Sequence, residues 1–174
     1  MKAMILITLI TIFMVFFSCG FFSDPKFSIQ RTDYIGNEIR TDGYYYYFVQ
    51  GTDRIVIHFF YKNGITLWVG TYANSNITEI EKEMVSLYSM RRKMKSAWGL
   101  FLVNGSKIQY ERIAEDPSSL AAAIDRRSGY IINDTTIYFT ENHYSDRNET
   151  KQINQTWHFK QFDNKPDSTN RFIK

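Results

Sequence analysis

Short runs of apolar and β-branched residues recur along most of the chain, and turn-forming residues separate them. Asn63-Gly64 and Asn104-Gly105 each stand between two such runs. Asn-Gly supplies the two positive-φ residues that a type I′ hairpin turn needs. Gly51-Thr52-Asp53 and Asn133-Asp134 occupy equivalent places. The pattern therefore predicts antiparallel strands joined by tight hairpins.

These turns divide the chain into eight expected strands, and Phe27–Arg31 is a candidate for a short additional one. A polar loop is expected at Asn142–Gln152, before the last strand. The eight strands are Tyr44–Gln50, Arg54–Tyr61, Ile65–Tyr72, Trp98–Val103, Lys107–Ile113, Gly129–Ile132, Thr135–Glu141 and Ile153–Phe162.

One stretch has a helical period instead. Between Ile77 and Met94, apolar residues recur at steps of three, four and seven. Glutamates lie early in this stretch and arginines and lysines late, which complements a helix dipole. We expect a helix at about 77–94. The segment Asp116–Asp125, with Pro117 near its start, predicts either one or two helical turns or an irregular flap.

Four consecutive tyrosines, Tyr44–Tyr47, open the first expected strand. Side chains alternate between the two faces of a strand, so both faces of this strand must be covered. We expect Tyr44, Tyr46 and Phe48 on the inner face. A shift of one residue in register would exchange the two faces.

Eight hairpin-linked strands with one mid-chain helix indicate a mainly β fold. We expect an antiparallel eight-stranded meander barrel or a strongly curved sheet, with the helix over one opening or face. A two-layer α+β fold, with the helix on an open sheet, is the alternative. The strand count, the segment "AWGLFLVNGSKIQYERI" and the aromatic content of 17% resemble the lipocalin-like barrels of small bacterial lipoproteins. A barrel of this size is filled by side chains or holds one small ligand.

The N-terminus is typical of an export signal. Ile5–Phe17 is apolar apart from two threonines and too short to span a bilayer comfortably. Ser18-Cys19 resembles the lipobox of bacterial lipoproteins, although Phe16 replaces the usual leucine. The resemblance implies that residues 1–18 are removed and that Cys19, the single cysteine, carries diacylglycerol and a palmitate-type acyl chain. An ordinary signal peptide and a retained membrane anchor are the alternatives.

The expected mature chain has a lipidated tether at 19–26, one β-rich domain at 27–163 and a loose polar tail at 164–174. Loss of Lys2 leaves 20 basic and 18 acidic residues, a net charge of +2, which gives no nucleic-acid signature. An acidic run directly after the cysteine is associated with surface export in some bacterial lipoproteins. Cys19 is followed by none, so the resemblance implies a periplasm-facing position at the outer membrane. The membrane is the expected partner through the lipid.

Few residues suggest chemistry. His58, His143 and His158 have no metal-ligand spacing, so we expect no metal and no cofactor. His58 is expected on a polar or half-buried strand face. Glu111 and Glu141 lie on strands and would approach each other across a barrel mouth, yet solvated faces are the simpler reading. The basic cluster Arg91–Lys95 either meets anionic headgroups or completes the helix dipole.

Two functions remain open, and an enzyme is not expected. The first is a structural or interaction lipoprotein that contacts an unknown envelope protein. The alternative is a binding module that holds a small apolar or carbohydrate ligand in an aromatic-lined barrel. The candidate lining residues are Tyr44, Tyr46, Trp68, Trp98, Tyr110 and Trp157.

Overall fold

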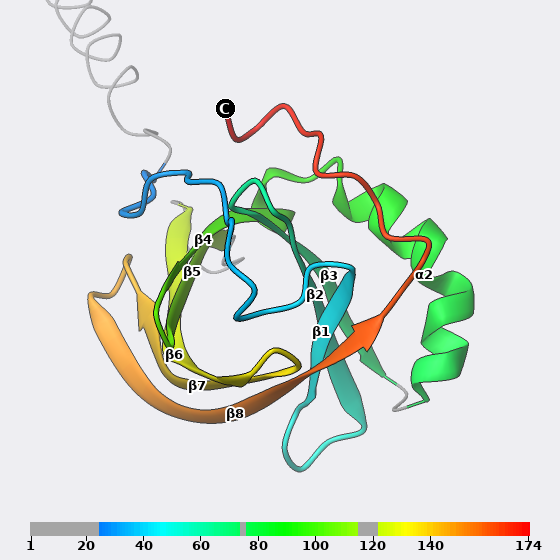
Figure 1. Ribbon diagram of the computed structural model, residues 1–174. Helices are drawn as coiled ribbons and strands as arrows, with labels where there is room; N and C mark the ends of the chain where they lie inside the picture. The colour runs from blue at the N-terminus through cyan, green and yellow to red at the C-terminus, as the bar shows by residue number, and fades with distance from the viewer. Residues whose placement is uncertain (1–24, 74–75, 115–121) are drawn as a thin grey trace, which may run out of the picture.

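A computed structural model describes residues 25–73, 76–114 and 122–174 of the protein. Eight antiparallel strands form one closed barrel in chain order, and the last strand pairs with the first (Figure 1). This confirms the meander barrel and excludes the open two-layer sheet. The strands are β1 Gly43–Phe48, β2 Arg54–Phe60, β3 Ile65–Ala73, β4 Trp98–Asn104, β5 Lys107–Ala114, β6 Ala123–Asn133, β7 Thr136–Tyr144 and β8 Glu149–Gln161.

The last three strands are longer than expected. The predicted loop Asn142–Gln152 was wrong, because the β7–β8 ladder continues to the pair Tyr144–Glu149. A polar run can form a strand when one of its faces is exposed to solvent, so polarity did not distinguish this strand from a loop. Ala123–Asp125 begin β6 rather than a helical turn, while residues 115–121 lie outside the described ranges. Phe27–Arg31 is not a strand.

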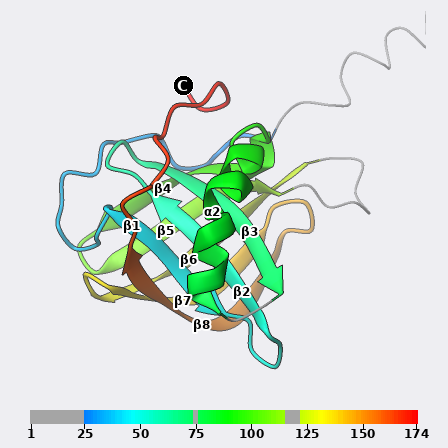
Figure 2. The ribbon, with the colours of Figure 1, turned by 90° about the vertical axis from the view of Figure 1, so that its right-hand side faces the viewer.

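The helix α2, Ile77–Arg91, lies against the outer face of the barrel (Figure 2). The Asn76 side chain accepts a hydrogen bond from the Thr78 N–H at its start. Ile80 and Met84 are buried against the strands. The helix ends three residues earlier than expected, and a short 3₁₀ turn, η1 at Lys95–Ala97, leads into β4.

Two apolar layers result, one inside the barrel and one outside it. The interior core comes from strands all round the barrel: Tyr45, Tyr47, Val56, Phe60, Phe101, Ile108, Tyr110, Ile137, Phe139 and Trp157, with Ile39 from the N-terminal segment. The outer core lies between β1–β4, α2 and the C-terminal tail: Tyr44, Ile55, Ile57, Phe59, Tyr61, Ile65, Leu67, Val69, Ile80, Met84, Ala97, Trp98, Leu100 and Ile173.

The expected faces of the tyrosine run were wrong. Tyr45 and Tyr47 belong to the interior core, whereas Tyr44 lies beneath α2. Tyr46 is half-buried on the outer face, and Phe48 is 48% exposed. The Tyr44 hydroxyl donates to Glu81 of α2 at 2.7 Å. Because the helix and the barrel interior both offer apolar cover, alternation alone could not distinguish the two faces.

The segment before β1 crosses one end of the barrel (Figure 1). The Tyr34 N–H donates to Lys62 O in the β2–β3 turn, and the Arg40 N–H donates to Asp134 O in the β6–β7 turn. Ile39 packs into the interior core beneath this crossing. We call the opposite end, which carries the β1–β2 and β7–β8 turns, the far end.

The C-terminal tail is packed, so the expectation of a loose tail at 164–174 was wrong. Ile173 is buried in the outer core, and Asp167 pairs with Arg92 of the C-cap of α2 at 2.7 Å. The Lys165 ammonium donates to Thr41 O and to Phe60 O, and it lies 4.2 Å from the Tyr61 ring centroid. The tail therefore connects α2 with β2 and with the residues just before β1.

Cys19 and the expected signal sequence lie outside the described residues, so their processing stays a prediction. Within the described ranges, no helix is both long and apolar enough to cross a bilayer.

Candidate functional site

The six aromatic residues expected to line a cavity divide between two faces. Trp68, Tyr110 and Trp157 point into the barrel. The other three, Tyr44, Tyr46 and Trp98, belong to the outer layer. Strand alternation separates them, so they do not form one common lining.

His58 lies at the centre of the interior core and is completely buried, contrary to the expected polar or half-buried face. Its ring centroid is 5.1 Å from Phe60, 4.8 Å from Tyr110 and 5.5 Å from Trp157. Neither ring nitrogen has a hydrogen-bond partner. Burial, with help from Arg112 and Arg127, holds the pKa of His58 well below its usual value. The imidazole is therefore neutral.

Arg127 of β6 also points inward, because its strand neighbours across the sheet are Tyr110 and Asn142. The guanidinium carbon lies 5.8–5.9 Å from the ring centroids of Tyr47, Tyr110 and Trp157. Its Nη1 donates to Gln155 Oε1 at 2.6 Å, while its Nε has no partner. No carboxylate among the described residues forms an ion pair with Arg127.

A second guanidinium lies next to it, in an ion pair. Arg112 and Asp125 face each other on β5 and β6, and Nε and Nη2 donate to Asp125 Oδ2 at 3.1 and 2.9 Å. The other carboxylate oxygen, Oδ1, is buried and unpartnered. The Arg112 guanidinium also lies 4.6 Å from the centroid of Trp68.

Arg91 of α2 reaches the same tryptophan from the helix, at 4.8 Å from its ring centroid. Its Nε donates to Val69 O, in the part of β3 that does not pair with β4. Arg92 binds Asp167 and the carbonyl of Thr169. Arg91 and Arg92, two members of the basic cluster considered for contact with membrane headgroups, thus bind other residues of the protein.

The inward-facing polar groups of the barrel have an unusual number of unmet hydrogen bonds. Leaving such an atom buried and unpaired costs about 1–3 kcal/mol. Seven of these atoms belong to six side chains that point inward: His58 Nδ1 and Nε2, Thr66 Oγ1, Asp125 Oδ1, Arg127 Nε, Asn142 Oδ1 and Trp157 Nε1. We call His58, Arg112, Asp125, Arg127, Asn142 and Trp157 the interior polar cluster.

Solvent reaches the edge of this cluster but not its centre. Trp68, Arg127 and Gln155 are half-buried, and the Arg112 side chain is 17% exposed. Asp125 and Asn142 are buried. The accessible edge lies towards the far end, away from the crossing N-terminal segment.

Glu111 and Glu141, the two glutamates considered as neighbours across a barrel mouth, both point out of the barrel. Glu111 is buried beneath the N-terminal segment, where it accepts hydrogen bonds from the N–H and hydroxyl of Ser28. Glu141 is exposed and accepts from Gln152. They do not meet across a mouth. In the described part of the chain, no three His, Cys, Asp or Glu side chains gather as metal ligands.

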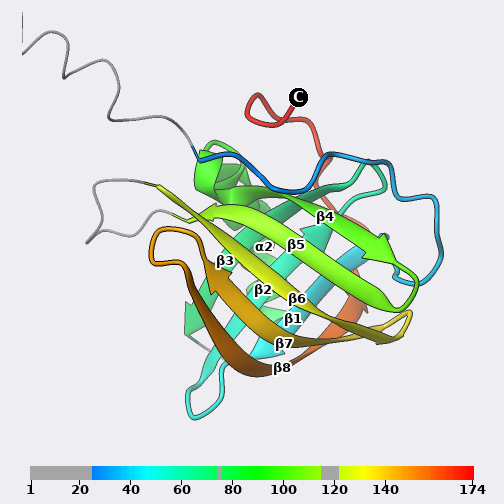
Figure 3. The same ribbon diagram turned by 90° about the vertical axis from the view of Figure 1, so that its left-hand side faces the viewer.

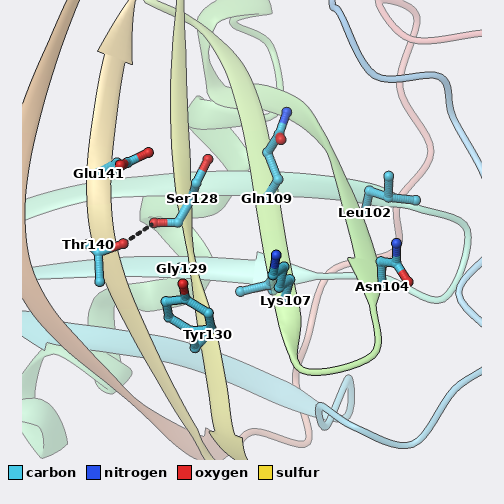
Figure 4. A pocket seen from close by; sticks show the side chains of 10 residues that line it. Leu102, Asn104, Lys107, Gln109, Ser128, Gly129, Tyr130, Thr140 and Glu141 are labelled. Carbon is cyan, nitrogen blue, oxygen red and sulfur yellow. Dashed lines mark hydrogen bonds between the residues drawn. The ribbon is translucent and has the colours of Figure 1, made fainter.

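A groove of about 370 Å³ lies on the outer face of β4–β7 (Figure 4). Neither α2 nor the tail covers this face (Figure 3). Leu102 and Tyr130, 42% and 46% exposed, stand beside Lys107 and Glu141. Sequence reasoning missed the groove, although apolar residues at outward positions of polar strands were a signal for it.

Comparison of the chain with protein-family models, with curated proteins and with solved structures finds no match in any of the three.

Proposed function

We propose that the protein is a non-enzymatic, lipid-anchored lipoprotein of the cell envelope whose barrel is a binding module for a small ligand. The observation that carries the binding role is the set of unpartnered polar atoms behind the far end. A filled structural barrel is most stable with an apolar interior, because unpaired buried polar groups only destabilise it. A polar occupant would supply the missing partners.

The anchoring part of the proposal rests on Ser18-Cys19 and the apolar run before it. Its place is the periplasmic side of the outer membrane. Metabolic labelling with palmitate tests this in the bacterial host. The wild-type chain should incorporate label and sediment with membranes, and Cys19→Ser should do neither. Equal labelling of the two would refute lipidation at Cys19.

Native mass spectrometry of the full chain, purified from its own host in detergent, tests the binding role. A bound mass beyond the lipid, lost on mild denaturation, is expected. Tryptophan fluorescence should then change when that ligand is returned, because Trp157 belongs to the interior polar cluster and Trp68 borders it. A protein without any additional mass would contradict a stably occupied module.

A second candidate, an interaction role with another envelope protein, is favoured by the groove on β4–β7. Its exposed Leu102 and Tyr130 would form the apolar centre of a contact with a polar rim. Crosslinking in cells should recover one specific partner, and Tyr130→Glu should abolish that product. Val85→Glu, on the exposed side of α2, is the matched control. Survival of the crosslink in Tyr130→Glu would remove this groove from consideration.

A further inference from the structure

The proposed function leaves the chemical class of the ligand open. The side chains of the interior polar cluster indicate which class would bind. Resting on that proposed function, we infer that the ligand is a small carboxylate with a planar body, and that Arg127 binds its carboxylate. Its binding site is the part of the interior polar cluster that borders the far end.

The charge balance of the cluster favours an anion. Arg112 and Arg127 bring two positive charges, Asp125 brings one negative charge, and His58 is neutral. Asp125 is already engaged by Arg112. Arg127 is left as a half-buried, inward-facing guanidinium that no described carboxylate contacts, although the charge of Asp125 also acts on it. An incoming carboxylate would give this partly buried charge a direct counter-ion.

The hydrogen-bond donors without partners also favour an anionic ligand. Arg127 Nε and Trp157 Nε1 are N–H groups without acceptors, and one of the two His58 nitrogens carries a further hydrogen. A guanidinium offers a planar fork that matches a carboxylate in two parallel hydrogen bonds. Arg127 uses Nη1 for Gln155, and its Nε is the N–H that has no partner.

The surroundings of Arg127 suit a flat ligand rather than a flexible chain. Tyr47 and Trp157 stack with ring planes 15° apart and centroids 5.2 Å apart. At the accessible edge, the Trp68 ring is already covered by the guanidinium groups of Arg91 and Arg112. A planar conjugated carboxylate can stack on such aromatic and guanidinium surfaces. Unpartnered Asp125 Oδ1 and Asn142 Oδ1 would accept from a hydroxyl or amino group on its ring.

A matched set of benzene derivatives tests the charge requirement on the purified full chain. Benzoate, benzamide and benzylamine have similar size and differ in charge. Tryptophan fluorescence and native mass spectrometry should detect one bound benzoate per chain. Benzamide should bind at least tenfold more weakly, and benzylamine should not bind.

Asn142→Asp is the most informative variant. Asn142 faces Arg127 across the β6–β7 ladder, so an aspartate there supplies the missing negative charge without a change of size. The variant should keep the melting temperature of the wild type or raise it, yet lose benzoate binding by at least tenfold. Asn154→Asp, at an exposed position of β8, is the control and should bind benzoate normally.

Arg127→Lys provides a second variant that keeps the charge but removes the planar fork. It should weaken benzoate binding by about tenfold while the chain remains folded by circular dichroism. Benzoate binding that survives Asn142→Asp, or benzamide binding equal to that of benzoate, would overturn the carboxylate inference.

The same experiments separate this inference from the binding role itself. A ligand that copurifies from the host while benzoate fails to bind would overturn the inference and leave the binding module in place. If nothing copurifies and none of the three compounds binds, both proposals fail.

Discussion

Tyr45 and Tyr46 are neighbours of the same chemical type in very different surroundings. Tyr45 is 1% exposed, packs edge-on against Phe60 and donates from its hydroxyl to Asp134 O at 2.6 Å. Tyr46 is half-buried on the outer face. At the scale of single residues, the cost of a substitution is set by this difference in burial.

Tyr45→Ala should lower the free energy of unfolding by about 3–5 kcal/mol, because it leaves a cavity in the interior core. Tyr46→Ala should cost less than half as much. Urea denaturation of the two variants measures both values. Equal losses, or a larger loss for Tyr46→Ala, would contradict the observed faces of β1.

His58→Phe should stabilise the protein, since phenylalanine fits among aromatic rings and has no unmet hydrogen bonds. The gain should be about 1–3 kcal/mol at pH 7. The low pKa of buried His58 means that the unfolded chain binds a proton first as the pH falls below about 6.5. Wild-type stability should therefore fall by up to about 1.4 kcal/mol more per pH unit than that of His58→Phe.

Denaturant titrations at pH 7, 6 and 5 measure this difference, and His158→Phe on an exposed site is the control. A parallel pH dependence in wild type and His58→Phe would show that His58 titrates normally. That result would mean that burial does not keep the His58 imidazole of the interior polar cluster neutral as the pH falls.

At the scale of elements, the half-buried Lys165 helps to hold the C-terminal tail against the barrel. Burial lowers the pKa of Lys165 to about 7, and the charge of Asp42 partly opposes this. The unfolded chain has a lysine pKa near 10.4, so between about pH 7 and 10 it binds more protons than the folded chain. The free energy of unfolding consequently rises with pH in this window.

Lys165→Met should remove this rise, which amounts to at most about 1.4 kcal/mol per pH unit. Unfolding free energies at pH 7, 8 and 9 provide the measurement. Lys62→Met, at an exposed turn residue, should keep the wild-type slope. If Lys165→Met and wild type have the same slope, Lys165 keeps an ordinary pKa and the tail is held differently.

Elements with local signals were predictable, and elements held by distant contacts were not. Asn63-Gly64 and Asn104-Gly105 marked two hairpins, and the spacing of Ile80 and Met84 marked α2. The expected type I′ turns were wrong, because only the glycine of each Asn-Gly pair has a positive φ. The packing of the tail depends on Lys165 reaching carbonyls more than a hundred residues away. No neighbouring residue in the sequence carries that information.

At the scale of the whole molecule, closure of the barrel depends on the contact between β1 and β8. Gly43 pairs with Gln161, and a Cβ at this glycine would lie only 2.0 Å from the backbone oxygen of Lys160. Because that neighbour is backbone, it cannot move aside cheaply.

Gly43→Ala should therefore open the β1–β8 seam and cost about 1–3 kcal/mol. Hydrogen exchange should show faster exchange of the amides of β1 and β8 than of β5. Asp42→Ala, which removes an exposed ion pair with Arg40 and a negative charge that acts on Lys165, should change stability by less than about 1 kcal/mol. Unchanged exchange in Gly43→Ala would mean that the seam tolerates the methyl group.

The candidate site was largely beyond the reach of the sequence. Arg112 and Asp125 face each other only because β5 and β6 pair in one particular register, and no turn motif fixed that register. Alternation from Tyr110, which was expected to line the barrel, also puts Arg112 inside, but the sequence prediction did not include Arg112. The sequence also did not show that Tyr45, and not Tyr46, shares the inner face of the barrel with Tyr110.

The hydrogen bonds between Ser28 and Glu111 limit the distance between the barrel and its proposed lipid anchor. Ser28 follows Cys19 by nine residues, which span about 30 Å when fully extended. Pro25 and Lys26 lie beside Ile124, His143 and Ser145, at the far end of the barrel (Figure 3). With the proposed lipid on Cys19, this short tether would keep the far end of the barrel near the membrane surface, so the protein would meet solutes at the bilayer rather than in the bulk of the compartment.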